Sequence, residues 1–164
     1  MMAVMESRSR PRPDHVDLCI IGSGSGLSLI DDDIDDWQIA LLDNGVGPTQ
    51  IFGGTCLNAG CIPSKMLAKP AGFSLAPEQA RLINADVKFL GVDHKAAQTR
   101  VFGRTDEVAE SGLAGLASRE NVQVLIGRAT FVDQHTISVG GRQLTADRIV
   151  IAAGSRPRMP EVPG

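Results

Sequence analysis

The stretch Val16-Asp17-Leu18-Cys19-Ile20-Ile21-Gly22-Ser23-Gly24-Ser25-Gly26 decides the fold class of this chain. Residues 16–21 form a short, nearly continuous apolar run, which is typical of a parallel strand covered on both faces. The glycine cluster ends that strand, and we expect a helix to begin within residues 22–30. A second apolar run follows at residues 38–42. The sequence therefore predicts a compact βαβ unit and an α/β, Rossmann-like fold with a central parallel sheet.

The glycine turn has the features of a dinucleotide-binding loop. Gly22 and Gly24 let backbone N–H groups approach a pyrophosphate, which the start of the following helix also attracts. Asp43 stands about 20 residues after the first glycine, where an acid accepts hydrogen bonds from ribose hydroxyls. Leu27 replaces the usual third glycine, so we expect helix and strand to pack slightly farther apart. Glycines that merely end a strand are the alternative, and Asp43 favours dinucleotide binding.

Two helical regions are expected between residues 63 and 118. The first begins near Pro63 and is divided by Pro70 and Pro77 into two short helices, because proline interrupts a helix interior. The second, residues 96–117, is interrupted by glycines. We expect it to yield a shorter helix at 107–118, capped by one of two residues, Thr105 or Asp106.

The last third of the chain predicts strands. Residues 122–126 form one apolar strand. Residues 130–132, 135–139 and 142–144 form a small antiparallel meander, in which Gly140-Gly141 supplies the positive φ angles of a two-residue hairpin turn. A separate apolar run at residues 148–152 then returns to the parallel sheet.

Length and composition limit the classes of function. The chain has 164 residues, 43% of them hydrophobic, and a net charge of -3. These values predict one domain and no excess of positive charge for nucleic acid or anionic lipid. No apolar run approaches the length of a membrane span, and no apolar segment of a secretory signal follows the basic N-terminus. We expect a cytoplasmic protein with a disordered leader at 1–14, one domain at 15–157 and the start of a linker at 158–164.

Cys56 and Cys61 form the second chemical feature. Four residues separate them, which does not fit a zinc clamp, and no further ligands complete a metal site. A disulfide over so short a loop stabilises a fold little, so redox exchange is the better explanation. Cys61 fits the start of a helix, where a thiolate is favoured, and Lys65 adds a nearby cation. Cys19 lies in the first strand and is expected to be a buried apolar residue.

The segment Gly53-Gly54-Thr55-Cys56-Leu57-Asn58-Ala59-Gly60-Cys61-Ile62-Pro63-Ser64-Lys65 resembles the active-site signature of the class I pyridine nucleotide-disulfide oxidoreductases. The resemblance extends from Val16 to Pro157 and includes Ala152-Ala153-Gly154-Ser155-Arg156-Pro157. The segments Gly22–Asp31 and Arg100–Asp106 are most similar to the mycothione reductase branch of the family. A dihydrolipoyl dehydrogenase-type enzyme is the alternative.

This resemblance implies an enzyme that binds FAD, uses NAD(P)H and acts on a small-molecule disulfide as a homodimer. It implies that Cys56 attacks the substrate disulfide, that Cys61 is the flavin-proximal sulfur forming a disulfide with Cys56, and that Lys65 lies near the flavin. The family's acid is usually glutamate, so Asp43 has a shorter reach. The FAD contacts that it implies are made by Gly22, Gly24, Ser25, Gly26, Asp43, Gly54, Thr55, Lys65, Ala129, Ala153, Gly154 and Ser155.

Two parts of the family's machinery have no match in the sequence. No second glycine fingerprint for the nicotinamide cofactor follows Lys65. His15, His94 and His135 lie outside the family's catalytic histidine motif and are expected at the surface, the first before the first strand and the second in a loop. We therefore expect a truncated product, and an inactive flavin-binding module is a further alternative for the isolated chain.

Overall fold

A six-stranded sheet forms the centre of the molecule in the computed structural model, which describes residues 14–156 and 158–162. Most of the expected leader at 1–14, and Pro157, lie outside the described residues. The strands lie side by side in the order β3-β2-β1-β6-β5-β4. Their bounds are β1 His15–Ile21, β2 Ile39–Asp43, β3 Val122–Ile126, β4 Thr130–Phe131, β5 Thr136–Val139 and β6 Arg142–Ile151.

The parallel part of the sheet is the core of the fold. β1 pairs in parallel with both β2 and β6, and β2 pairs in parallel with β3. All five residues of β2 are buried, as expected for a strand covered on both faces. One face packs against Leu113 and Leu116 of the long helix, and the other against residues of β5 and β6. The predicted α/β class with a central parallel sheet and an antiparallel edge is confirmed.

The antiparallel meander and the last parallel strand are joined in one element. The sequence predicted separate strands at 142–144 and 148–152, whereas β6 is continuous from Arg142 to Ile151. Its first residues pair antiparallel with β5, and residues 145–151 pair in parallel with β1. The turn between β5 and β6 is the predicted one, because Gly140 and Gly141 have φ angles of 57° and 82°.

The connection between β1 and β2 contains no α-helix, which corrects the prediction for residues 22–30. It consists of two 3-10 helices, η1 (Ser25–Leu29) and η2 (Asp32–Ile34). Ile30 leaves the helical conformation, and the Asp31 carboxylate then accepts a hydrogen bond from Asp33 N–H and starts a new turn. Glycine and aspartate favour such turns over a regular helix. The site therefore lacks the full helix dipole that the sequence predicted.

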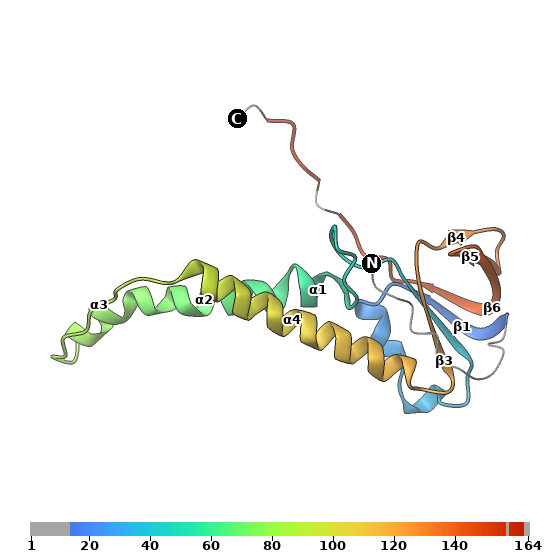
Figure 1. Ribbon diagram of the computed structural model, residues 1–164, viewed down its shortest axis with the longest axis horizontal. Coiled ribbons are helices and arrows are strands. Elements are labelled where there is room, and N and C mark those ends of the chain that lie inside the picture. The colour runs from blue at the N-terminus through green and yellow to red at the C-terminus, as the bar shows by residue number, and fades with distance from the viewer. Residues whose placement is uncertain (1–13, 157, 163–164) are drawn as a thin grey trace.

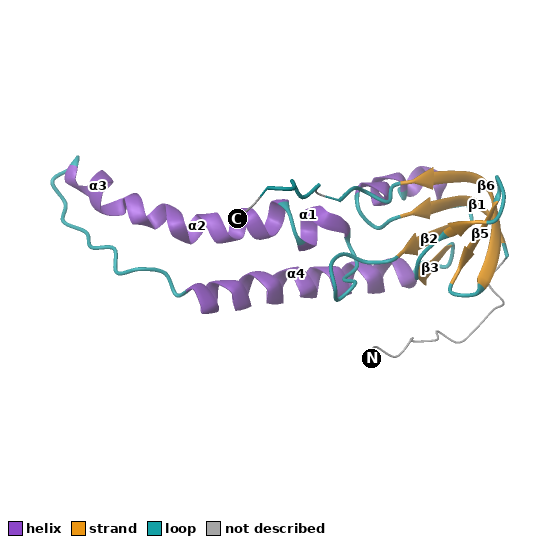
Figure 2. Ribbon diagram, turned by 90° about the horizontal axis from the view of Figure 1, so that it is seen from above, coloured by secondary structure: helices purple, strands orange, loops and turns teal. Residues whose placement is uncertain are grey.

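The segment between β2 and β3 forms a pair of long helices that project away from the sheet (Figures 1 and 2). The predicted break at Pro70 and Pro77 is not observed, because the outgoing part is helical without a gap from Cys61 to Arg81. Pro70 lies inside α2, and Pro77 lies in the first turn of α3, where proline is tolerated. Only a 3-10 segment separates the two α-helices. No helix in the described part of the chain is long and apolar enough to cross a membrane. The bounds are α1 Gly54–Asn58, α2 Cys61–Gly72, η3 Phe73–Leu75, α3 Ala76–Arg81 and α4 His94–Ala117.

Helix α4 is longer than the sequence predicted. It runs without interruption through its three glycines, and Asp93 caps it by accepting a hydrogen bond from Ala96 N–H. Val101, Thr105 and Ala109, spaced four residues apart, are its buried residues. This stripe follows the helical period, and α4 packs against α1, α2 and β3. Tertiary packing thus outweighs the low helix propensity of glycine.

Candidate functional site

The glycine turn lies at the carboxyl end of the parallel strands, where open α/β sheets bind ligands. Gly22 follows β1, Asp43 ends β2 and Ala152 follows β6. Ala152 N–H donates to Ile21 O (2.8 Å), and Gly127 N–H donates to Asp43 O (2.7 Å). The segments that the sequence assigned to one cofactor, including the chain around Ala129 just after Gly127, therefore meet at one edge of the sheet.

Glycines at this edge are needed for close contact between backbones. Gly22 has φ +110°, and a Cβ there would lie 2.3 Å from Ala152 O. A Cβ on Gly54, which has φ +73°, would lie 2.5 Å from the Cα of Gly24. The turn after β1 thus rests directly on the start of α1, which carries Cys56.

Gly26 provides the close packing that the third glycine of the usual pattern provides. A Cβ on Gly26 would lie 2.8 Å from side-chain carbons of both Ala152 and Ile20. Leu27 packs instead against the apolar core. The substitution of leucine for the third glycine is therefore accommodated by a glycine one position earlier.

Ser23, which the sequence reasoning missed, joins three segments of the site. It is 2% exposed. Its N–H donates to Asp43 Oδ1 (3.2 Å), and its Oγ accepts from Gly53 N–H (2.8 Å). Asp43 Oδ2 also accepts from Gly45 N–H (3.1 Å). Both oxygens of Asp43 thus hold the loops in place, and the ribose contact predicted for Asp43 would use their remaining lone pairs.

The glycines Gly22, Gly24 and Gly54, which we call the glycine cradle, fit a dinucleotide at this end of the sheet. Gly22 and Gly54 lie so close to neighbouring backbone atoms that a Cβ on either would clash with them. Glycine turns of this kind let a pyrophosphate approach main-chain N–H groups. Ser25 and Thr55 are exposed beside the cradle. Ala153, Gly154 and Ser155 are exposed just beyond β6, and Ala129 is half-buried between β3 and β4.

The two cysteines come together because the helix breaks between them. α1 ends at Asn58 and α2 begins at Cys61, with Gly60 between. A Cβ on Gly60 would lie 3.1 Å from Thr55 O, so glycine permits this tight break. The exposed Cys56 and Cys61 are free thiols, and their side chains are hydrogen-bonded to each other. The predicted distorted turn and the position of Cys61 at a helix start are both observed.

The pKa values of Cys56 and Cys19 are raised for different physical reasons. The hydrogen bond to Cys61 raises the pKa of the Cys56 thiol above its ordinary value, and loss of solvation and the charge of Cys61 act in the same direction. The positive charge of Lys65 opposes this pKa shift. Burial raises the pKa of the Cys19 thiol to about 12, and Cys19 is fully buried in β1. At a given pH the raised pKa leaves a smaller fraction of Cys56 as thiolate while it faces Cys61, and Cys19 takes no part in thiolate chemistry.

Lys65 lies one helical turn after Cys61 on α2 and is exposed. It lines one end of an open cleft of about 820 Å³ between α2, α4 and the loop before α4. Lys69 and Arg100 also line this cleft, and Arg100 donates to Met66 O (3.2 Å). The approach to the cysteines along α2 is therefore positively charged.

Asn58, between the two cysteines, is a second residue that the sequence reasoning missed. It is 9% exposed, and its Nδ2 donates to Phe52 O (2.7 Å) and to Gly54 O (3.1 Å). Its Oδ1 is buried and has no hydrogen-bond partner within residues 14–156 and 158–162. Asn58 thus fixes the loop before α1 from the side opposite Ser23.

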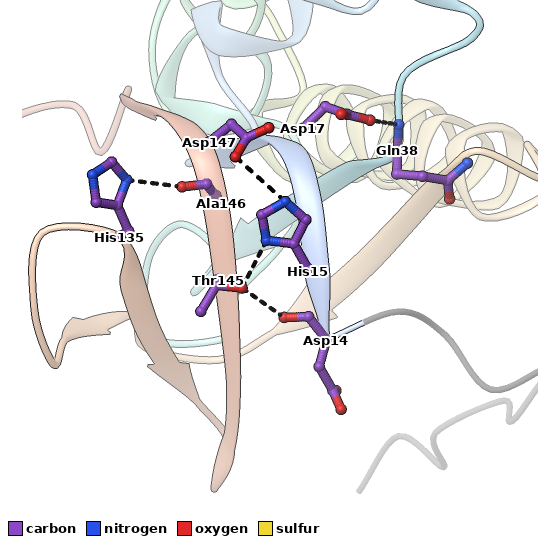
Figure 3. A network of polar contacts seen from close by, with 8 residues as sticks. All are labelled: Asp14, His15, Asp17, Gln38, His135, Thr145, Ala146 and Asp147. Carbon is purple, nitrogen blue, oxygen red and sulfur yellow. Dashed lines mark hydrogen bonds and ion pairs between the residues drawn. The ribbon is translucent and has the colours of Figure 1, made fainter.

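All three histidines are exposed, as predicted, but two of them lie in other elements than the sequence predicted. His15 is the first residue of β1, not a residue before it, and His94 is the first residue of α4. His15 Nδ1 lies 2.9 Å from Thr145 Oγ1, and His135 Nδ1–H donates to Ala146 O at 3.1 Å. Figure 3 shows both contacts. The length of β1, about 20 Å at 3.3 Å per residue, separates His15 from the glycine turn.

No cluster of side chains suited to a metal ion occurs in the described ranges.

Residues 16–164 match the family described as pyridine nucleotide-disulphide oxidoreductase. The chain is 35% identical to mycothione reductase of Mycobacterium tuberculosis over 88% of its own length and 32% of that enzyme. It is 32% identical to glutathione reductase of a Nostoc species, over 90% of its length and 31% of that enzyme.

A solved structure agrees with these relatives. The HOCl-induced flavoprotein disulfide reductase RclA from Escherichia coli superimposes with a TM-score of 0.68 at 26% identity, over 90% of this chain and 30% of that one. The chain thus spans about a third of the length of the curated relatives named above. Its family match covers nearly all of its sequence and agrees with the cysteine pair and the glycine cradle at the sheet edge. The chain belongs to the pyridine nucleotide-disulphide oxidoreductase family.

Proposed function

We propose that this chain is the flavin-binding and thiol-bearing portion of an FAD-dependent, NAD(P)H-linked disulfide reductase. The observation that carries the proposal is the pair of exposed thiols, Cys56 in α1 and Cys61 at the start of α2, which stands directly beside the glycine cradle. A structural pair of thiols would have no reason to lie exposed at the edge of a sheet that binds ligands.

The cysteine pair performs the exchange in two steps. Cys56, as thiolate, attacks one sulfur of a substrate disulfide, forms a mixed disulfide and releases one thiolate. Cys61 then attacks the Cys56 sulfur, releases the second thiolate and leaves a Cys56–Cys61 disulfide.

FAD, when bound and reduced through NAD(P)H, would supply the two electrons that return the Cys56–Cys61 disulfide to two thiols. Gly24 and Gly54 would hold the pyrophosphate through main-chain N–H groups. Gly22, whose own N–H donates to Leu42 O (2.7 Å), would shape the turn that contacts it. Asp43 would contact the ribose, Ala129 would lie near the adenine, and Ser25, Thr55 and residues 153–155 would lie along the cofactor. Lys65 would stand near the flavin.

The proposed substrate is a low-molecular-weight disulfide of the mycothione type. The identity to mycothione reductase supports this choice. Lys65 and Lys69 of α2 and Arg100 of α4 suit a substrate that carries carboxylates or other anionic groups. We propose that the enzyme acts as a homodimer.

A single-turnover assay tests the thiol chemistry on the chain itself. The reduced chain is freed of reductant and mixed with mycothiol disulfide, glutathione disulfide or lipoamide, and the released thiol is measured. We expect fast release of two thiols per chain, with mycothiol disulfide the fastest. Cys61→Ser should release one thiol and keep a mixed disulfide on Cys56, whereas Cys56→Ser should react slowly.

Other outcomes would change the proposal. If lipoamide reacts fastest, the dihydrolipoyl dehydrogenase type is the better assignment. A mixed disulfide that accumulates on Cys61 in the Cys56→Ser chain would reverse the roles of the two sulfurs. If no disulfide reacts while FAD still binds, the chain is a flavin-binding module only. Steady disulfide-dependent oxidation of NADPH by the chain with FAD would contradict its expected incompleteness.

A further inference from the structure

Ser23 is buried where the glycine turn meets the cysteine segment. Its N–H donates to Asp43 Oδ1 at 3.2 Å, and its Oγ accepts from Gly53 N–H at 2.8 Å. The ends of β1 and β2 and the start of α1 are therefore joined through one residue, whose backbone holds β2 and whose hydroxyl holds α1. Gly24 also approaches Gly54 closely, but that contact is between backbone atoms and does not involve the Ser23 hydroxyl.

The acceptor that Ser23 provides fixes the start of α1. Gly53 is the N-cap of this helix, has a left-handed φ of 108° and makes no side-chain cap. Ser23 Oγ therefore acts as an external cap for Gly53 N–H. On the other side, Asn58 Nδ2 holds the carbonyls of Phe52 and Gly54. α1 has only five residues, so the orientation of the Gly53 peptide directly sets the position of Cys56.

We propose that the Ser23 hydroxyl is a positioning group that couples the glycine turn to the cysteine pair, so that its removal changes how Cys56 reacts without touching either sulfur. This inference rests on the proposed redox role of the pair. A change in the glycine turn, such as occupation by a dinucleotide, reaches Cys56 through the same hydrogen bond.

The expected direction follows from the contacts of Cys56. Without Ser23 Oγ, Gly53 N–H loses its acceptor and α1 loosens. The thiol of Cys56 then moves away from the thiol of Cys61. The side-chain hydrogen bond with Cys61 and the charge of Cys61 raise the pKa of Cys56, and a hydrogen bond with the Cys61 backbone lowers it by less. A looser α1 therefore gives more Cys56 thiolate at a given pH.

The test measures alkylation of the reduced chain by iodoacetamide from about pH 6 to about pH 10, which brackets an ordinary thiol. Mass spectrometry of the peptides gives separate rates for Cys56 and Cys61. In Ser23→Ala we expect the midpoint for Cys56 to fall by about half a pH unit, which is about a threefold faster reaction near pH 8. Ser23→Thr, which keeps the hydroxyl, should restore the profile.

Ser28→Ala is the matched control, because Ser28 lies in η1 of the same loop and its exposed hydroxyl donates only to Ser25 O (2.9 Å). Its profile should equal that of the unchanged chain. An unchanged Cys56 profile in folded Ser23→Ala, or an equal shift in Ser28→Ala, overturns the proposal. A merely destabilising change would lower Tm without moving the midpoint.

A measurement on the unchanged chain covers the case in which Ser23→Ala does not fold. Hydrogen exchange followed by NMR should find Gly53 N–H protected, because Ser23 Oγ accepts its hydrogen bond. Exchange at the rate of a free loop amide would overturn the proposal. Failure of the chain to reduce disulfides would count against the proposed function alone, since neither alkylation nor exchange requires turnover.

Discussion

At the scale of single residues, the pKa of Cys56 depends on its neighbour Cys61. The hydrogen bond between them raises the pKa of Cys56, whereas Lys65 opposes that rise. Cys19, with a pKa of about 12, is enclosed in the core. Their surroundings thus raise the pKa of both Cys56 and Cys19, by different physical causes.

Removing Cys61 should make Cys56 more acidic. In Cys61→Ala the hydrogen bond and the charge that hold the proton on Cys56 are absent, so the midpoint of its alkylation should shift to lower pH, toward that of an ordinary thiol. The measurement is the pH profile of iodoacetamide labelling at Cys56. Lys65→Gln should shift the midpoint the other way, since it removes an opposing charge. A Cys61→Ala profile shifted to higher pH would contradict the account.

Gly22→Ala should destabilise the fold strongly. Its Cβ would lie 2.3 Å from Ala152 O in a backbone conformation with φ +110°. Such a change costs at least about 2 kcal/mol, which lowers Tm of a chain of this size by about 4–8 °C. Thermal unfolding followed by circular dichroism measures this loss. A chain with unchanged Tm would show that β1 and the segment after β6 are not in this close contact.

At the scale of elements, the sequence predicted what depends on local composition and missed what depends on packing. The buried strands and the Gly140-Gly141 hairpin were predicted, because apolar runs and paired glycines have few alternatives. The continuity of α4 and of β6 was missed, because it arises from contacts distant in sequence. A helix at 22–30 was predicted wrongly, since glycine and Asp31 favour turns.

Glycine-to-alanine changes in α4 should stabilise the chain. Gly103 and Gly112 lie inside this helix without positive φ, and a Cβ on either would meet no atom within 4 Å. Alanine should add about 0.5–1 kcal/mol at each position, or about 2 °C in Tm. Thermal unfolding of each variant tests this, with Gly22→Ala as the opposite case. A loss of stability in both would show that α4 is broken at its glycines.

At the scale of the whole molecule, one edge of the sheet gathers segments that are far apart in the sequence. The turn after β1, the end of β2, the loop before α1 and the chain after β6 meet there, and the cysteine pair stands beside them. The sequence predicted each of these segments through the family resemblance. It did not predict Ser23 and Asn58, because their hydrogen bonds depend on how the loops meet in space.

A core substitution in β2, a fully buried strand, should affect the whole sheet. Leu41 of β2 is fully buried among Leu18, Ile20 and Ile39. Leu41→Ala should cost about 2–5 kcal/mol, because it removes apolar contacts and leaves a cavity. Denaturant unfolding measures this cost, and Leu82→Ala, at an 83% exposed position, is the matched control with little effect. Equal losses in the two variants would contradict this assignment of the core.

The central claim, that the glycine cradle and the cysteine pair form one flavin site, is tested most directly by cysteine alkylation in the presence of FAD. The reduced chain is labelled with iodoacetamide over a range of FAD concentrations, and Cys56 and Cys61 are quantified separately. The account predicts saturable protection of Cys61, the flavin-proximal sulfur, with Cys56 still reactive. Absence of protection at both cysteines in a chain with native circular dichroism, or protection of Cys56 with Cys61 left reactive, would contradict it.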